Sequence, residues 1–161
     1  MAGVDPCMIG DIELFRGLSA AQLSQVSGHL YCRTYPAGAN IITVEQPGEV
    51  VYLIQNGTLK IHIEQANGSD VILAILGRGD IVGEMSLVDS AGRSASVITL
   101  EESKLFWMAG KDFQECLRAY PLIAQNLVRI LSRRVRLANE LVQALANLDV
   151  HGRAEHRVAL R

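Results

Sequence analysis

The sequence predicts an α+β domain in which an antiparallel β-sandwich or barrel-like roll is flanked by helices and followed by one long helix. Three observations predict this class. Residues 31–108 contain short β-branched runs separated by glycine, the segments on either side have helical periodicity, and the strands do not alternate with helices as in a parallel sheet. With 161 residues, the chain can bury a core without a metal or disulfide.

The composition excludes several classes of function. The net charge is −2, without the basic excess expected of a surface that binds nucleic acid. The three cysteines, Cys7, Cys32 and Cys116, lack the spacing of metal ligands, and so do the four histidines. We therefore expect no metal site, and buried or idle thiols in a reducing compartment.

Neither a secretion signal nor a membrane span is expected. The first ten residues lack a basic region followed by a long apolar run, and no apolar run reaches the roughly 18 residues that a spanning helix needs. We expect a cytoplasmic protein without membrane contact.

The first helix is predicted just before the strands. Ser19 and Gln22 have the spacing of a capping box, in which each side chain satisfies a free backbone donor of the other residue. Apolar Leu23, Val26 and Leu30 follow at helical spacing. A short amphipathic helix is expected here.

The strand region contains three clear runs, at residues 50–54, 59–63 and 71–76. Asn56-Gly57 and Asn67-Gly68 lie between successive runs, and Asn-Gly tolerates the positive φ angles that a tight turn requires. The sequence therefore predicts two hairpins. Phe106 and Trp107, near the end of the region, are expected in the core of the roll.

Two helices are predicted after Gly110. The first covers residues 111–120, and Pro121 suits the first turn of the second, which should reach about residue 148. Apolar residues recur along the second helix at spacings of three and four, as in a helix that packs along a partner. They are Val128, Leu131, Val135, Ala138, Val142 and Leu145. We expect a homodimer through residues 121–148; packing on its own domain alone is the alternative.

Residues 77–97 carry the chemistry. Their glycines fall as G-x-G-x-x-x-G after a hairpin, which differs from the dinucleotide-binding fingerprint that opens a βαβ unit. A short helix that begins after Gly83 would instead offer free amide donors to an anion. Arg93, ten residues after Gly83, could fold back to this helix start and bind phosphate oxygens through two parallel N–H groups.

The neighbours of Arg93 suit the same ligand. Ser94 adds a hydroxyl donor, and Gly83 lets backbone approach a ligand closely. Glu84 would repel a phosphate, but a carboxylate can accept hydrogen bonds from a sugar hydroxyl. The segment therefore predicts a site for a phosphorylated sugar.

This segment resembles the phosphate-binding cassette of cyclic-nucleotide-binding domains. The resemblance rests on Gly83-Glu84-Met85-Ser86-Leu87 followed by Arg93-Ser94-Ala95. The flanking residues 79–84, 133–134 and 147–153 are similar to bacterial catabolite-activator-type regulators of the Crp/Fnr family, so that the resemblance extends from about residue 15 to residue 153. It implies a jelly-roll-like β-roll, a double-stranded β-helix, with a dimerisation helix at its end.

The resemblance also implies roles for single residues. Arg93 would pair with the cyclic phosphate, with Ser94 and the backbone amides of Met85 and Ala95 completing the cradle. Glu84 and the Gly83 carbonyl would hold the ribose 2′-hydroxyl. Four further positions would wall the pocket, namely Ile61, Leu73, Ala74 and Leu76.

Two residues of the long helix are implied as well. Arg134 would reach the ribose-binding glutamate and connect the ligand to the helix. Where the bacterial cAMP receptor has two hydroxyl residues that read adenine, this chain has Ala138-Asn139. The Asn139 amide both donates and accepts hydrogen bonds, so it could read a purine edge. cAMP is expected as the effector, with cGMP open.

The resemblance divides the chain into three parts: a roll with its N-terminal helices at residues 1–120, a dimerisation helix at 121–148, and the start of a hinge at 149–161. In the family a helix-turn-helix domain follows, so DNA binding is expected only through a domain missing here. Residues 151–161 should be partly disordered without it.

Other functions remain as alternatives to a cAMP sensor of a transcription regulator. An enzyme is not expected, because neither a metal cluster nor an activated nucleophile accompanies Arg93. A stand-alone or ligand-free dimerisation module would keep the roll and the helix. A sensor of a haem-bound gas would show a visible absorbance band.

Overall fold

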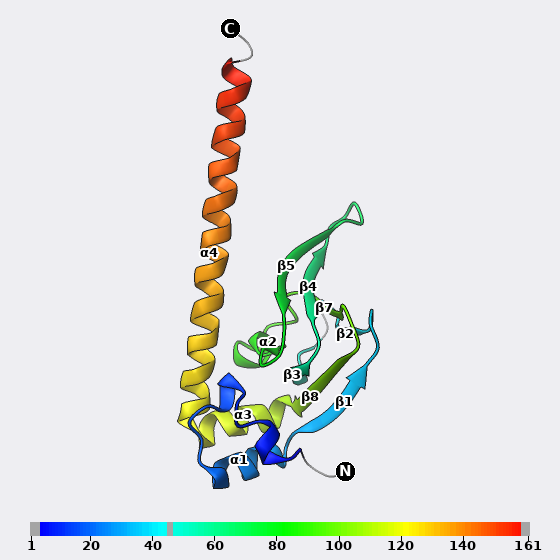
Figure 1. Cartoon of the computed structure of the whole chain (residues 1–161), viewed down its shortest axis with the longest axis vertical. Helices are drawn as coiled ribbons and strands as arrows, with labels where there is room; N and C mark the ends of the chain where they lie inside the picture. Colours follow the sequence, from blue (N-terminus) through cyan, green and yellow to red (C-terminus); the bar gives the residue numbers. More distant parts are fainter. Residues whose placement is uncertain (1–3, 45–46, 159–161) are drawn as a thin grey trace. The chain divides into compact units, whose positions relative to one another are not determined.

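The computed structural model describes the backbone of residues 4–44 and 47–158, and the side chains of those residues up to residue 147. The chain forms two compact units, which divide between Asn126 and Leu127. The first unit contains the strands and the shorter helices, and the second is the greater part of the last helix (Figure 1).

The N-terminal part of the first unit has three short helical elements: η1 (Pro6–Met8), η2 (Glu13–Phe15) and α1 (Ala20–Ser27). The predicted capping box of α1 is confirmed. The backbone N–H of Gln22 donates to Ser19 Oγ at 3.3 Å, and the backbone N–H of Ser19 donates to Gln22 Oε1 at 2.9 Å. Two otherwise free donors at the helix start are therefore satisfied by side chains.

Eight strands form two four-stranded antiparallel sheets. The first has the order β1-β8-β3-β6 and the second the order β2-β7-β4-β5, so chain neighbours often lie in different sheets (Figure 1). The bounds are β1 Tyr31–Tyr35, β2 Asn40–Ile42, β3 Val50–Asn56, β4 Leu59–Glu64, β5 Asp70–Leu76, β6 Ile81–Val82, β7 Ser96–Thr99 and β8 Ser103–Ala109. This confirms the predicted antiparallel roll.

The main core of the roll lies between the two sheets. Side chains from both sheets meet in one buried aliphatic cluster, and each such side chain stabilises the fold by about 1.5–3 kcal/mol. The first sheet contributes Ile54, Val82 and Leu105, and the second contributes Ile42, Leu59, Leu76 and Val97. The buried members of this cluster are all aliphatic, and Tyr35 and Tyr52 pack against it from partly buried positions.

The opposite face of the first sheet is also buried. Val51, Leu53, Phe106 and Met108 are at most 1% exposed, and they alternate along β3 and β8 with the residues that face the second sheet. Helix α3 (Gly110–Ala119), which begins one residue before its predicted start, contacts both strands. Phe106 is thus in the core as predicted, whereas Trp107 is half-buried and stacks on Tyr31.

One of the two predicted hairpins is confirmed and the other is wrong. Asn67-Gly68 joins β4 to β5, which pair in antiparallel register. Asn56-Gly57 joins β3 to β4, but β3 pairs with β8 and β6, in the other sheet. Gly57 has the positive φ expected of such a turn, at 107°. The Asn-Gly residues therefore predicted that the chain turns after β3. They did not predict which strands pair with β3, because that depends on the rest of the roll.

Helix α4 (Pro121–Val158) begins at the predicted proline and is longer than predicted. The partial disorder expected for residues 151–161 is not found at residues 151–158, which are helical, and residues 159–161 lie outside the described part of the chain. A glycine inside a helix costs only about 1 kcal/mol relative to alanine, so Gly152 does not end the helix.

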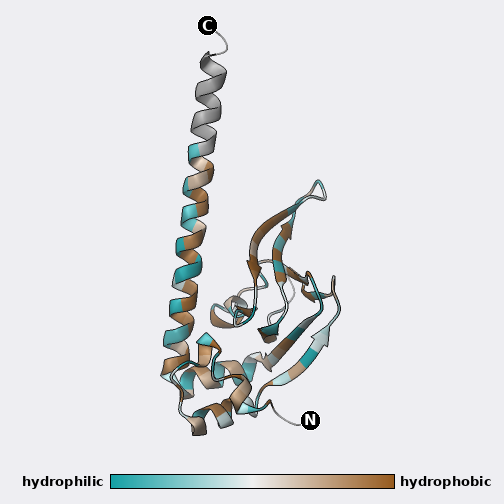
Figure 2. Cartoon of the chain, in the orientation of Figure 1, coloured by the Kyte–Doolittle hydropathy of each residue, from teal (hydrophilic) through white to brown (hydrophobic). Residues whose placement is uncertain are grey.

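The second unit exposes many apolar side chains, which recur along α4 in Figure 2. They are Val128, Val135, Leu137, Leu141, Val142 and Leu145, each more than half exposed in the single chain. Leu137 and Leu141 lie outside the predicted repeat, so the apolar surface is broader than the sequence pattern indicated. In the described residues, no helix is both long enough and apolar enough to cross a bilayer.

Two glycines with similar backbone angles allow the turn after β3 to be tested. A Cβ at Gly57, with φ 107°, would lie 2.7 Å from the Cα of Ser103, whereas one at Gly68, with φ 79°, would meet nothing within 4 Å. Gly68→Ala should cost about 1 kcal/mol for the left-handed backbone. Gly57→Ala should cost about 2 kcal/mol or more, because it adds a backbone clash. Urea unfolding of both variants measures the difference; equal losses would contradict the close packing.

Candidate functional site

The candidate site is built on the segment that follows β6. Both residues of β6, Ile81 and Val82, are buried, which fixes the strand in the core. Gly83, with φ 86°, then turns the chain into the short helix α2 (Met85–Val88). The helical turn predicted after Gly83 is therefore confirmed. Arg93 lies in the loop before β7, three residues before that strand begins at Ser96.

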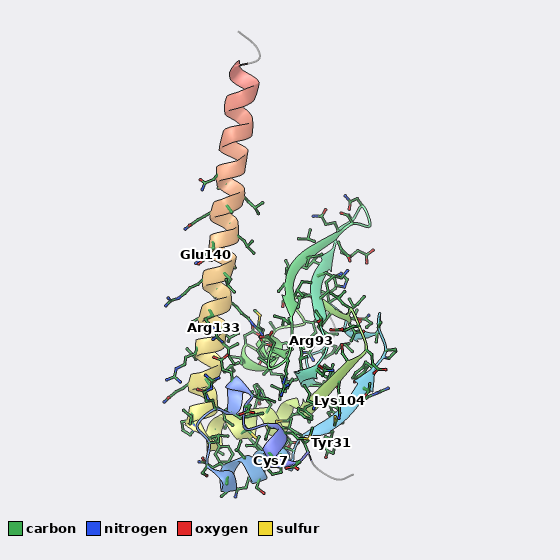
Figure 3. All side chains as sticks on the ribbon, viewed as in Figure 1. Cys7, Tyr31, Arg93, Lys104, Arg133 and Glu140 are labelled. Carbon is green, nitrogen blue, oxygen red and sulfur yellow. The ribbon has the colours of Figure 1, made fainter. Side chains whose placement is uncertain are left out.

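Arg93 is the centre of this segment, and its side chain is 8% exposed. Nη1 donates to the carbonyl oxygen of Gly83 at 2.7 Å and to Ser86 Oγ at 3.0 Å. Nη2 donates to the carbonyl oxygen of Val50 at 2.6 Å. The guanidinium thus joins the start of β3, the turn after β6 and helix α2; Figure 3 shows Arg93 beside that helix.

Burial lowers the pKa of Arg93, while the charges of Tyr52 and Glu84 act in the opposite direction. Glu84 is itself only 2% exposed. A buried charge is costly unless it is compensated, and Arg93 is stabilised by three hydrogen bonds and by the nearby charge of Glu84. Glu84 and Arg93, both predicted site residues, lie near enough for their charges to interact.

Ser86 was not among the predicted site residues, and neither was the carbonyl of Val50. Ser86 is 7% exposed, accepts from Arg93 and donates to the Gly83 carbonyl at 3.3 Å. A serine three residues after a carbonyl in a helical turn can bond back to it, so local spacing contained a signal for Ser86. Val50 lies 43 residues from Arg93 in the sequence, so local spacing contained no signal for its contact.

Gly83 has a structural role that the sequence did not indicate, in addition to its predicted role toward a ligand. We expected its lack of a side chain to admit a ligand. A Cβ at this position would lie 2.5 Å from Nη1 of Arg93 and 3.0 Å from the Val50 carbonyl oxygen. The glycine therefore makes room for the guanidinium, and its carbonyl is already an acceptor for Arg93 and Ser86.

The other cassette residues lie around this arginine with different exposures. Ser94 and Met85 are exposed, Met85 by 50%, while Ala95 is buried. Helix α2 has no side-chain cap at its start. Backbone amides at such a start attract an anion.

The four predicted wall residues come from β4 and β5, which pair with each other. Ile61 pairs with Ala74, and both pack on the core cluster that contains Leu76. The register shifts at this point, so Leu73 is an extra residue in a β-bulge, and it is 45% exposed. The structure thus brings three of the four residues to the core side of the hairpin and leaves Leu73 exposed.

Arg134 and Asn139 lie on α4 in the second unit, which is described by itself. Their contacts with the ligand and with Glu84 remain predictions.

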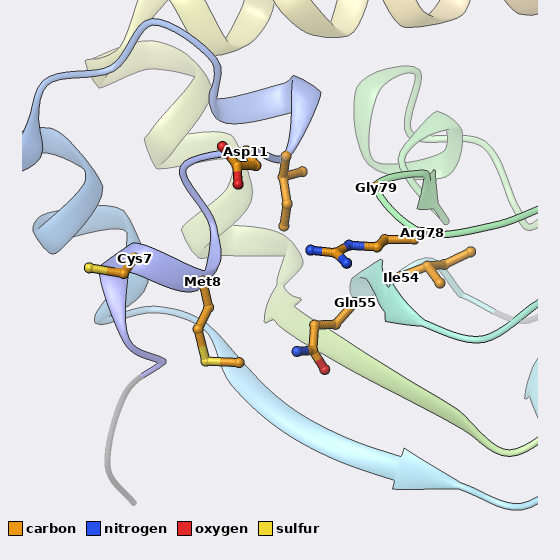
Figure 4. A pocket seen from close by; sticks show the side chains of 8 residues that line it. Cys7, Met8, Asp11, Ile54, Gln55, Arg78 and Gly79 are labelled. Atoms are coloured by element: carbon orange, nitrogen blue, oxygen red, sulfur yellow. The ribbon is translucent and has the colours of Figure 1, made fainter.

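Hollows also lie elsewhere among the described residues of the first unit, and two of them are of a size to note. One, of about 310 Å³, lies between the N-terminal segment and the turn before β6; Figure 4 shows Arg78 extending from that turn toward the segment with Met8 and Asp11. The other, of about 390 Å³, includes Tyr52 and the stacked pair Tyr31 and Trp107. Neither is lined by Glu84 or Arg93. Within the described residues, no group of three or more side chains could hold a metal ion.

Comparisons with known proteins agree with this geometry. Residues 32–120 match the family model of the cyclic nucleotide-binding domain. The chain is 32% identical over 143 residues to the cyclic AMP receptor protein of Thermus thermophilus, an alignment that covers 89% of this chain and 66% of the relative. The chain therefore spans slightly less than two thirds of that relative's length.

Solved structures show the same fold. The crystal structure of Thermus thermophilus catabolite activator protein is similar with a TM-score of 0.73 and 33% identity, over 83% of this chain and 63% of that one. The N-terminal domain of a transcriptional regulator from Streptomyces coelicolor A3(2) is similar with a TM-score of 0.63 and 28% identity, over 83% of this chain and 95% of that one. This chain belongs to the cyclic nucleotide-binding domain family and is homologous to cAMP-responsive transcription regulators.

Proposed function

We propose that this chain is a cAMP-binding sensor of a transcription regulator, in which ligand binding changes the arrangement of a helix-mediated dimer. The observation that carries the proposal is the buried Arg93, held beside α2 and close enough to Glu84 for their charges to interact. A fixed cation next to a helix start suits a phosphate, and an adjacent carboxylate suits a sugar hydroxyl.

The phosphate contacts are assigned to Arg93, to the Ser94 hydroxyl and to the backbone amides of Met85 and Ala95. Arg93 and the exposed Ser94 are neighbours in the loop before β7, so one anion could contact both side chains. Charge-assisted hydrogen bonds are the stronger class, and a guanidinium can form two to one phosphate. Arg93 should therefore supply most of the affinity for the phosphate.

The ribose contact is assigned to Glu84, with the Gly83 carbonyl as a second acceptor. Two donors, Arg93 Nη1 and Ser86 Oγ, already use this carbonyl. A carbonyl oxygen has two lone pairs, so a ribose hydroxyl must share or replace one of these bonds. We therefore expect Glu84 to be the main ribose acceptor.

The contacts with the base of the nucleotide are assigned to the predicted wall residues of β4 and β5 and to α4. Ile61, Leu73, Ala74 and Leu76 would give it an apolar surface, and Asn139 would bind its polar edge. An amide can offer a donor and an acceptor side by side, which suits adenine, with cGMP as the alternative ligand. Arg134 would connect Glu84 to α4, so that the ligand favours one arrangement of the dimer.

DNA contacts are assigned to a domain outside this chain. The relative matched here is named a cyclic AMP receptor protein and is about one half longer than the aligned region. The net charge of −2 does not provide a basic surface for DNA.

The phosphate assignment is tested by calorimetric titration of the purified chain with cAMP and with cGMP. Saturable binding is expected, and Arg93→Ala should weaken it by about 100-fold or more, because charge-assisted bonds to the phosphate are lost. Arg78→Ala is the matched control, since Arg78 is exposed and lies in the turn before β6. An equal loss in both variants, or the absence of heat with either nucleotide, would contradict the proposal.

The dimer assignment is tested by sedimentation of variants that place a glutamate on α4. Val142→Glu lies in the predicted apolar repeat and should convert a dimer into a monomer, because the charge would be buried in the seam. Asn147→Glu places the same side chain on the opposite side of the helix and should leave the dimer intact. A wild-type chain that sediments as a monomer at all concentrations would refute the seam.

A further inference from the structure

The hollow of about 390 Å³ in the first unit collects most of the polar aromatic side chains of the chain. The sequence contains one tryptophan and four tyrosines. The tryptophan and three of the tyrosines line this hollow, namely Tyr31, Tyr35, Tyr52 and Trp107. Because the buried cluster between the two sheets is aliphatic, these rings are concentrated at one place instead of being spread through the core.

The register of the first sheet explains why these rings meet. Tyr31 of β1, the edge strand, lies opposite Trp107 of β8, and Trp107 lies opposite Tyr52 of β3 (Figure 3). Alternate residues of a strand share a face, so Arg33 and Tyr35 of β1 lie on the same face as Tyr31. The rings of Tyr31 and Trp107 are stacked, with their centroids 4.5 Å apart. The hollow therefore has a preformed aromatic wall.

The charge in the hollow is positive. The described residues that line it include one cation, Arg33, and no carboxylate. The guanidinium carbon of Arg33 lies 4.9 Å from the centroid of the Tyr35 ring, which holds the cation beside the aromatic wall. In the described part of the chain, the ion pairs found do not involve Arg33. The other polar groups of the aromatic residues, the phenol hydroxyls and the indole N–H, are hydrogen-bond donors.

These features suit a small monoanion that carries an aromatic ring. A guanidinium can bind a carboxylate through two parallel N–H groups, and one arginine balances one negative charge. All the lining residues belong to β1, β3 and β8, so the hollow differs from the cassette, where a helix start is present. Its volume is in the range of sites for small ligands.

We propose that this hollow binds a small planar aromatic carboxylate, whose ring packs on Tyr31 and Trp107 and whose carboxylate pairs with Arg33. The site is distinct from the cassette, because Glu84 and Arg93 do not line it. Val50 is shared by both sites, since it lines the hollow and its carbonyl oxygen accepts a hydrogen bond from Arg93. The proposal does not depend on nucleotide binding.

The test is a titration of the purified chain with benzoate, followed in the ¹⁵N–¹H spectrum. The chain has one tryptophan, so its indole group gives one signal, which reports on the hollow itself. We expect this signal to shift saturably. Benzyl alcohol, which has the ring without the charge, should bind about tenfold more weakly. Cyclohexanecarboxylate, which has the charge without the aromatic ring, should bind about threefold more weakly.

Arg33→Gln should weaken benzoate binding by about tenfold, because the charge-assisted hydrogen bonds to the carboxylate are lost. Arg33 is exposed, so the fold should tolerate the change. The matched control is Arg118→Gln, which removes the same charge from an exposed position on α3, outside the hollow, and should leave the affinity unchanged. Equal losses in the two variants, or benzyl alcohol binding as tightly as benzoate, would overturn the pairing with Arg33.

A second measurement uses only the unaltered protein. Nuclear Overhauser contacts should connect the ring hydrogens of bound benzoate to Trp107 and Tyr31. An indole signal that does not move at any benzoate concentration would refute the site. Shifts concentrated at residues 83–95 instead would place benzoate at the cassette, and would equally refute a separate site in the hollow. Neither result bears on cAMP binding, which is measured by its own titration.

Discussion

The buried guanidinium of Arg93 is the constraint on which the candidate site depends. Its hydrogen bonds reach Val50 at the start of β3, Gly83 in the turn after β6, and Ser86 in α2. Val50 lies 43 residues from Arg93 in the sequence. Because a buried charge is tolerated only when its donors are satisfied and a counter-charge is near, these segments and Glu84 must keep their positions around it.

The roll supports this arrangement from both sides. Its aliphatic core anchors β6, from which the cassette begins, and it also holds the inner side of the β4–β5 hairpin. The bulge at Leu73 interrupts that hairpin and leaves a large apolar side chain exposed next to buried neighbours. Such irregular positions within a rigid sheet are where binding residues are commonly presented.

Local chemistry was enough to predict much of the fold. The capping box of Ser19, the proline at the start of α4 and the Asn67-Gly68 hairpin each depend on residues within a few positions of one another. The Asn56-Gly57 hairpin was predicted by the same reasoning and is wrong, because a turn determines only that the chain reverses. Which strand pairs with β3 depends on β8, about 50 residues later in the chain.

The sequence by itself therefore determined the class of fold, the cassette, and the residue types that a phosphate and a sugar require, because these are expressed in short motifs. Only the tertiary structure decided that Gly83 makes room for Arg93, that Ser86 and the Val50 carbonyl engage its donors, and that Leu73 lies in a bulge. The physical reason is that hydrogen-bond saturation and close packing depend on atoms from segments far apart in the sequence. Spacing along the chain does not specify how such segments meet.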